Sequence, residues 1–252
     1  MGSGDEVRIT VDGGVRTVLL DRPAKRNALT RPMLAALEAA FAAEPAPDER
    51  VTVVRASGPT FCAGVDLGER APGGAEAIER ALHAVERYPL PVVAVVTGDA
   101  IAGGAELAFH CDLVVASATA RIGMSLAQIG LAAPWPLAVK LVDAVGPATA
   151  RELLLLGDPL PAARLAELGV VTRAVPADEV EATAGEVIDR LCANAPLSLR
   201  AMKAALVRAT ETRAAVPHDD VDALARAARR SEDAREGMRA RLEKRPAVFR
   251  GR

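Results

Sequence analysis

The sequence predicts an α/β fold, because segments typical of strands alternate with segments typical of helices. β-branched and apolar runs predict strands near residues 7–11, 15–20, 51–55, 92–96 and 113–116. Helices are expected near residues 31–43, 74–87, 104–109, 126–129 and 136–144. This alternation indicates layers of helix and sheet in the first part of the chain.

After Gly146 the pattern becomes mainly helical. Helices are expected near residues 148–156, 162–168, 177–194, 196–210 and 221–241, with residues 170–175 as a short strand that pairs back. We therefore expect a core domain of residues 1–195, followed by a C-terminal helical region of residues 196–252.

The composition is that of a chain that can bury a substantial core. Its 252 residues are 50% hydrophobic and 25% charged, and the formal net charge is -2. This balance gives no electrostatic reason to expect nucleic acid or an anionic membrane as a partner. No apolar run reaches the roughly 20 residues that span a bilayer, and residues 1–4 lack the features of a signal peptide. We expect a cytoplasmic protein.

The cysteines give no indication of a metal site. Cys62, Cys111 and Cys192 are widely spaced and form no Cys-x-x-Cys motif. They are typical of small buried residues in a reducing compartment. We expect neither a metal nor a bound cofactor.

The most informative segment is residues 98–106, where a pair of glycines opens a predicted helix directly after a buried strand. The first N–H groups of a helix have no acceptor within it and lie at the positive end of its dipole, so they stabilise a developing oxyanion. Glu106 lies three residues after Gly103 and therefore on nearly the same face. It is placed to move a proton at the carbon beside a bound carbonyl. The alternative is a glycine-rich turn with a capping glutamate.

A second turn could supply another N–H donor. Residues 57–67 follow the predicted strand at 51–55 and contain Phe-Cys-Ala-Gly-Val-Asp-Leu at 61–67. Upstream, the chain carries Arg22-Pro23 and Asn27-Ala28-Leu29, and downstream Gly-Gly-Ala-Glu-Leu at 103–107 and Glu-Lys-Arg-Pro at 243–246. Together and in this order, these motifs resemble the crotonase family, also called the enoyl-CoA hydratase/isomerase superfamily, almost from end to end.

The resemblance implies a fold, an assembly and a substrate class. The fold would be a crotonase-like spiral of ββα units with a C-terminal helical trimerisation region, and the protein would form a homotrimer or homohexamer. The substrate would be an acyl-CoA thioester of the kind met in fatty acid metabolism. Coenzyme A would enter as part of the substrate.

The resemblance also implies site residues. The backbone N–H groups of Val65 and Gly103 would hold the thioester oxygen, and Glu106 would be the catalytic base. Substrate and CoA contacts would come from Lys25, Arg26, Ala28, Ala63, Asp66, Leu67, Gly68 and Gly104. Lys25 and Arg26 would meet phosphates, although an ordinary solvated surface pair is an equal alternative. Trp135 could form a wall of the acyl pocket, or it could simply pack between Pro134 and Pro136.

The second glutamate of enoyl-CoA hydratases has no counterpart. Its position falls on Leu126, which can neither orient water nor deliver a proton. Three hypotheses follow: an enoyl-CoA hydratase or isomerase that works through Glu106, a weakly catalytic or non-catalytic acyl-CoA binding protein, and a structural subunit of a larger complex. Decarboxylases and thioester hydrolases of the same family stay open as well.

Overall fold

The computed structural model describes residues 6–66, 68 and 74–252. Leu67, one of the residues expected to contact CoA, lies outside the described residues. The chain divides into two compact units, which are described separately. The first unit comprises Met1–Ile122 and Pro161–Ala209, and the second comprises Gly123–Leu160 and Thr210–Arg252. The domain boundary expected after residue 195 stays a prediction.

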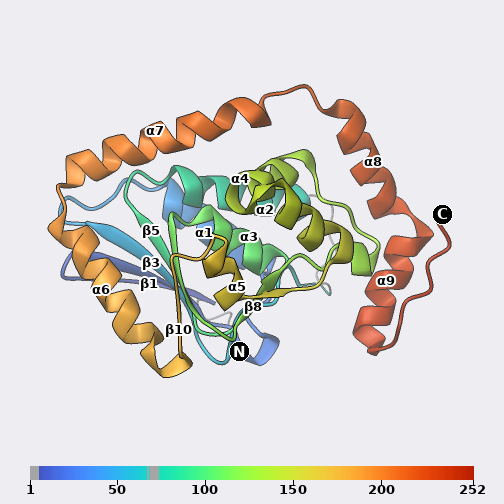
Figure 1. The fold of residues 1–252 in the computed structure, drawn as a ribbon, viewed down its shortest axis with the longest axis horizontal. Coiled ribbons are helices and arrows are strands. Elements are labelled where there is room, and N and C mark those ends of the chain that lie inside the picture. Colours follow the sequence, from blue (N-terminus) through green and yellow to red (C-terminus); the bar gives the residue numbers. More distant parts are fainter. Residues whose placement is uncertain (1–5, 67, 69–73) are drawn as a thin grey trace. The chain divides into compact units, whose positions relative to one another are not determined.

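A six-stranded sheet with the strand order β1-β2-β3-β5-β7-β10 forms the framework of the first unit (Figure 1). Its strands are β1 (Val7–Asp12), β2 (Val15–Leu20), β3 (Val51–Ala56), β5 (Val92–Val96), β7 (Leu113–Ser117) and β10 (Arg173–Val175). β1 and β2 pair in an antiparallel hairpin, and the other neighbours pair in parallel. The expected strand at 170–175 thus pairs back onto β7, although it is shorter than expected.

Helices cover this sheet because its central strands are apolar on both faces. All five residues of β5 are buried, as expected for a strand inside a parallel sheet. α6 (Val180–Ala193) buries Val180, Ala184 and Ile188 against the valines of β3, β5 and β7, and Figure 1 shows it beside the sheet. The other helices of this unit are α1 (Arg31–Ala42), α2 (Gly74–Arg87), α3 (Gly103–His110) and α5 (Ala162–Glu167), with short 3-10 turns at Pro23–Lys25 and Ala177–Glu179.

Four short strands were not predicted from the sequence. β4 (Thr60–Cys62), β6 (Asp99–Ile101), β8 (Arg121–Gly123) and β9 (Leu160–Pro161) form a small second sheet. β4 and β6 pair in parallel with a shift in register between Thr60 and Cys62. Strands of two or three residues are too short to show an alternating apolar pattern. β4 and β6 nevertheless lead directly into the two glycine-rich turns.

The second unit is mainly helical. It contains a 3-10 turn at Ala127–Ile129, α4 (Trp135–Arg151), a π-helical turn at Glu152–Leu156, α8 (Asp219–Arg230) and α9 (Glu232–Glu243), while α7 (Pro196–Ala214) contains a boundary between the units. Gly146, with φ 74°, kinks α4 where two separate helices were expected. The prediction of a single helix at 221–241 is wrong, because two helices cover this range. Ser231 has φ -64° and ψ 163°, ends α8, and caps α9 by accepting from Ala234 N–H.

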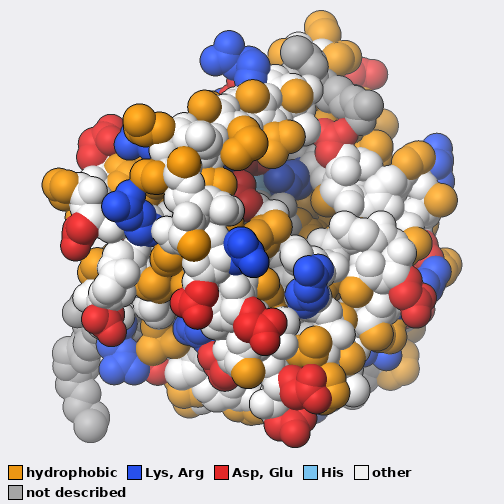
Figure 2. All heavy atoms as spheres, turned by 60° about the vertical axis from the view of Figure 1, so that its left-hand side comes forward, with side chains coloured by type: hydrophobic (Ala, Val, Ile, Leu, Met, Phe, Trp, Pro, Cys, Tyr) orange, Lys and Arg blue, Asp and Glu red, His pale blue; other side chains and the backbone are white. Residues whose placement is uncertain are grey.

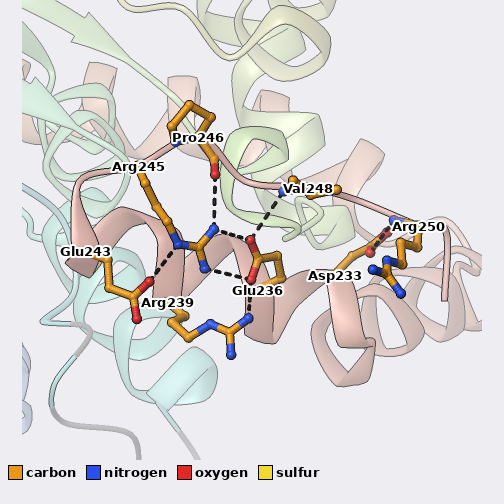
Figure 3. A network of polar contacts seen from close by, with 8 residues as sticks. All are labelled: Asp233, Glu236, Arg239, Glu243, Arg245, Pro246, Val248 and Arg250. Atoms are coloured by element: carbon orange, nitrogen blue, oxygen red, sulfur yellow. Dashed lines mark hydrogen bonds and ion pairs between the residues drawn. The ribbon is translucent and has the colours of Figure 1, made fainter.

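The last residues of the chain are fastened to α9 by charged hydrogen bonds (Figure 3). Arg245 and Arg239 donate to the carboxylate of Glu236, which also accepts from Val248 N–H at 3.3 Å. Asp233 accepts from the N–H groups of Arg250 and Gly251, each at 2.7 Å. These bonds fix the residues that follow α9 along its surface.

The surface is mixed in charge and polarity. Figure 2 shows basic, acidic and apolar side chains interspersed over the visible face. Within the described part of the chain, no helix is both long and apolar enough to cross a bilayer. This distribution fits the small formal net charge of -2.

Candidate active site

The start of α3 places the Gly103 N–H at a buried helix end. Gly103 is the first residue of the helix, so its N–H has no acceptor within it. Ala102 precedes it with φ 50° and ψ -119°, a conformation that few residues with a side chain adopt. This turn connects β6 directly to α3.

The turn after β4 presents the Val65 N–H in a similar way. Leu29 N–H donates to Gly64 O at 2.8 Å, and Asp66 N–H donates to Leu29 O at 2.9 Å. This isolated parallel bridge uses the residues on either side of Val65, so the N–H of Val65 faces the opposite side. Gly64 has φ 91°, which favours glycine at this turn.

The two turns approach each other closely because glycines stand where they meet. A Cβ atom added to Gly103 would lie 3.5 Å from Val65 N, and one added to Gly64 would lie 3.3 Å from Gly103 N. Ile78 of α2 also lies close to Gly103, because its Cδ1 would be 2.8 Å from a Cβ added to Gly103. Gly104 packs against β4, because its Cβ would lie 2.3 Å from Cys62 O.

Glu106 lies in the first turn of α3 and is half-buried. Its N–H donates to Ala102 O at 2.9 Å. Burial raises the pKa of the neighbouring Cys62 thiol to about 12, and the negative charge of Glu106 adds to this rise. Cys62 therefore stays a neutral thiol. The Glu106 carboxylate lies near enough to the two glycine-rich turns to act electrostatically on the Cys62 thiol.

Most of the described residues expected to contact CoA lie in two adjoining loops, 22–29 and 63–68, the second described except for Leu67. Ala63 N–H donates to Arg26 O at 3.0 Å, which joins the loops next to Ala28. Lys25 and Arg26 are exposed at the surface. Gly68 N–H, at 2.9 Å from Oδ1, lowers the pKa of Asp66, and Arg22 and the charge of Lys25 lower it further.

Arg22 and Asn27 lie in the same loops, although neither side chain was expected there from the sequence. Arg22 Nη1 donates to Asp66 Oδ2 at 2.7 Å, and Asn27 is fully buried beside it. The only sequence signal was their place in the motifs at 22–29, which carried the family resemblance but no role for either side chain.

Trp135 and Leu126 belong to the second unit. The ring of Trp135 stacks on that of His218 with centroids 5.8 Å apart, and the backbone N–H of Trp135 donates to Asp222 Oδ1 at 3.3 Å. Leu126 is half-buried just before the 3-10 turn at Ala127–Ile129. The expected role of Trp135 as a wall of the acyl pocket stays a prediction. Among the described residues, no group of three or more His, Cys, Asp or Glu side chains is placed to hold a metal ion.

A largely parallel sheet with two neighbouring glycine-rich turns defines the class of protein to which the chain belongs. The sequence profile of the enoyl-CoA hydratase/isomerase family matches residues 10–252. The chain belongs to this family, whose members act on CoA thioesters, and its fold is that of the crotonase superfamily.

Individual relatives support this assignment. The chain is 39% identical to a Thermus thermophilus protein that carries enoyl-CoA hydratase in its name, with 94% of this chain and 98% of that one covered. It is 33% identical to an enoyl-CoA hydratase of Mycobacterium tuberculosis, covering 99% and 98%.

Solved structures agree with the sequence comparisons. A crystal structure of an enoyl-CoA hydratase from Mycobacterium avium subsp. paratuberculosis has a TM-score of 0.86 at 31% identity, covering 97% of this chain and 98% of that one. Methylmalonyl-CoA decarboxylase complexed with 2S-carboxypropyl CoA has a TM-score of 0.90 at 25% identity, and both chains are covered completely, at 100%. The same fold thus serves more than one reaction of CoA thioesters.

Proposed function

We propose that this protein is an acyl-CoA enzyme that stabilises a thioester enolate, with Glu106 as its base. The observation that carries this proposal is the proximity of the Val65 and Gly103 backbone nitrogens, since a Cβ on Gly103 would lie 3.5 Å from Val65 N. Two converging N–H groups can bind an oxygen that gains negative charge. Glu106 lies one helical turn from Gly103 and can reach the carbon beside that carbonyl.

Isomerisation of an enoyl-CoA needs only this one base. Glu106 takes a proton from C2 of a 3-enoyl thioester, and the electron pair moves onto the thioester oxygen, where the two N–H groups hold it. The electron pair returns as Glu106 delivers the proton to C4, and the double bond then lies between C2 and C3. The carboxylate is regenerated, so the cycle needs no other reactant.

Hydration can also run through Glu106 alone, at a lower rate. The carboxylate takes a proton from water as the water oxygen adds to C3 of a 2-enoyl thioester, and it then gives the proton to C2. A second acid would normally share this work, but Leu126 occupies its expected position. General acid–base assistance is typically worth about 10²- to 10⁴-fold in rate, so the missing partner weakens hydration more than isomerisation.

The loops at 22–29 and 63–68 are the proposed binding region for the CoA moiety. Lys25 and Arg26 are exposed cations beside the proposed oxyanion hole, which suits phosphate groups. The backbone around Ala28, Ala63, Asp66 and Gly68 would line the path to the thioester, and Gly104 lets α3 approach β4 closely.

Decarboxylation is a second candidate, favoured by one observation. Methylmalonyl-CoA decarboxylase superposes with a TM-score of 0.90. Loss of CO₂ from a 2-carboxyacyl thioester leaves its electron pair as the same enolate. This step needs no acid at the position of Leu126, and the enolate then takes a proton from the solvent or a neighbouring acid.

A panel of thioesters distinguishes these reactions. The protein is incubated with 2-enoyl, 3-enoyl and 2-carboxyacyl CoA thioesters, and products are identified by mass and ultraviolet absorbance. Hydration adds the mass of water, decarboxylation removes that of CO₂, and isomerisation moves the double bond into conjugation at constant mass. Saturable binding without any product would instead support a non-catalytic acyl-CoA binding protein.

A further inference from the structure

We infer that Arg22 and Asn27 are positioning residues, which hold the Val65 N–H in place for the bound thioester oxygen. The inference rests on the proposed function, because it assigns these side chains a task in the oxyanion hole. Neither of them touches the reacting atoms. They would act through the backbone of the loops at 22–29 and 63–68.

Asn27 joins three stretches of backbone from a fully buried position. Its Oδ1 accepts from Arg22 N–H at 2.8 Å, and its Nδ2 donates to Ser57 O and Thr60 O, each also at 2.8 Å. The residue has φ 52° and no exposed surface. A buried amide with all these partners satisfied fixes the loop 22–29 against the entrance to β4.

Arg22 connects that loop to the turn that carries Val65. Its Nη1 donates to Ala28 O at 3.1 Å and to Asp66 Oδ2 at 2.7 Å, while its Nε pairs with Glu6 Oε1 at 3.0 Å. The side chains of Arg22 and Asp66 are only 17% and 20% exposed. Such a shielded pair, held by a planar guanidinium at several points, restrains geometry better than an exposed ion pair does.

The restraint reaches the donor through a single residue. Asp66 follows Val65 directly, and its N–H donates to Leu29 O. Asp66 is therefore held by its backbone to Leu29 and by its side chain to Arg22. Gly64, on the other side of Val65, is held by Leu29 N–H at 2.8 Å. With both neighbours fixed, the Val65 N–H keeps one direction. A displacement of about 1 Å at a catalytic group can cost about 10²-fold in rate.

The test uses an aromatic 2-enoyl CoA thioester, whose absorbance shifts to longer wavelength when its carbonyl is polarised on binding. Arg22→Gln is expected to reduce this shift and to lower kcat about 10- to 100-fold with little change in KM, since the donor acts mainly on the transition state. Arg22→Lys is expected to recover part of the absorbance shift and part of kcat. Arg8→Gln is the matched control. Arg8 is 56% exposed and forms a separate ion pair, at 2.5 Å, with Asp21, the residue before Arg22 in the sequence.

The outcomes separate this inference from the proposed function. An unchanged absorbance shift and kcat in Arg22→Gln overturn the positioning role and leave the oxyanion hole intact. Absence of any shift in the unaltered protein overturns both. If Arg22→Gln does not fold, Asp66→Asn removes the charge from the other end of the pair, and a full shift in that variant rejects the inference. In the double variant, a loss no larger than that of Arg22→Gln alone supports action through this pair.

Discussion

Gly64 and Ala102 each precede one of the two proposed N–H donors, and both have a positive φ, 91° and 50° respectively. Glycine adopts this conformation freely, whereas alanine is strained there by roughly 1–3 kcal/mol. Strain of this kind persists only where the surrounding structure enforces it. Here Ala102 joins β6 directly to α3, and these two elements impose the conformation on it.

The neighbouring glycines of α3 give a paired test of this geometry. Gly103→Ala would bring a Cβ to 2.8 Å from Ile78 Cδ1, the flexible end of a side chain, and to 3.5 Å from Val65 N. We expect this variant to fold and to lose about 10- to 100-fold in kcat/KM, because the methyl group crowds the oxyanion position. Circular dichroism and turnover of the thioester found active in the panel measure the two effects.

Gly104→Ala is expected to lower the stability of the fold. Its Cβ would lie 2.3 Å from Cys62 O and 2.7 Å from Cys62 Cβ, where backbone must move. Overpacking of this kind typically costs about 1–3 kcal/mol, so the melting temperature should fall. Equal melting temperatures for the two variants, with equal activity, would contradict the separate roles assigned to these glycines.

The main-chain part of the proposed site was indicated by the sequence, and the side chains that support it were not. Gly103 and Glu106 follow from local signals, since a strand, a glycine turn and a helix start are contiguous in the sequence. Arg22 meets Asp66, and Asn27 meets Thr60, only after the loops have come together. Their pairing depends on the sheet register and leaves no periodic pattern in the sequence. Ile78 was missed for the same reason.

Among the elements, α9 shows how the end of the chain is secured. Gly237 lies on the face that meets the 3-10 turn at Ala127–Ile129, where a Cβ would be 2.4 Å from Ile129 C. On another part of the helix, Glu236 accepts from Arg245 Nη2 at 2.9 Å (Figure 3). α9 thus holds the segment that follows Leu126 as well as the C-terminal residues.

The Glu236 network should make stability depend on acid pH. Hydrogen bonds from Arg245, and then from Arg239, hold the pKa of Glu236 well below its usual value of 4.5. A lowered folded-state pKa stabilises the fold fully above the usual value, and this stability is lost as the pH falls toward the folded-state pKa. We therefore expect Glu236→Gln to lower the melting temperature at neutral pH, and the gap from the unaltered protein to narrow below about pH 4.5.

Glu232→Gln serves as the control for this titration. Glu232 pairs with Arg252 at 3.1 Å, but its side chain is 59% exposed, so its loss should change the melting temperature little. A gap between Glu236→Gln and the unaltered protein that stays constant from neutral to acid pH would show that the carboxylate charge of Glu236 does not stabilise the fold.

Long elements were predicted well, and short ones were missed. The strands at Val15–Leu20 and Val92–Val96 and the helix at Gly74–Arg87 agree with the expected bounds because each has a sustained apolar pattern. β4 and β6 have three residues each and depend on pairing with one another. The break at Ser231 was overlooked because the apolar spacing continues across it, although serine is a strong N-cap.

For the whole molecule, exposed apolar helix surfaces support self-association. Met202 and Leu206 lie one turn apart on one face of α7 and are 55% and 70% exposed, and Leu224 of α8 is 73% exposed. Large apolar side chains grouped on helices favour burial against another surface. We expect light scattering at micromolar concentration to report a trimer or a hexamer. A stable monomer under the same conditions would contradict this expectation.

The central claim is that Glu106 moves a proton at the carbon beside a thioester carbonyl held by Val65 and Gly103. Deuterium exchange tests it without knowledge of the native acyl group. A saturated acyl-CoA is incubated with the protein in deuterium oxide, and the label entering C2 is followed by mass and proton NMR. We predict exchange with the unaltered protein and a loss of about 10²-fold or more in Glu106→Gln, with thioester affinity nearly unchanged. Equal exchange rates in the two proteins would contradict the assignment of Glu106 as the base.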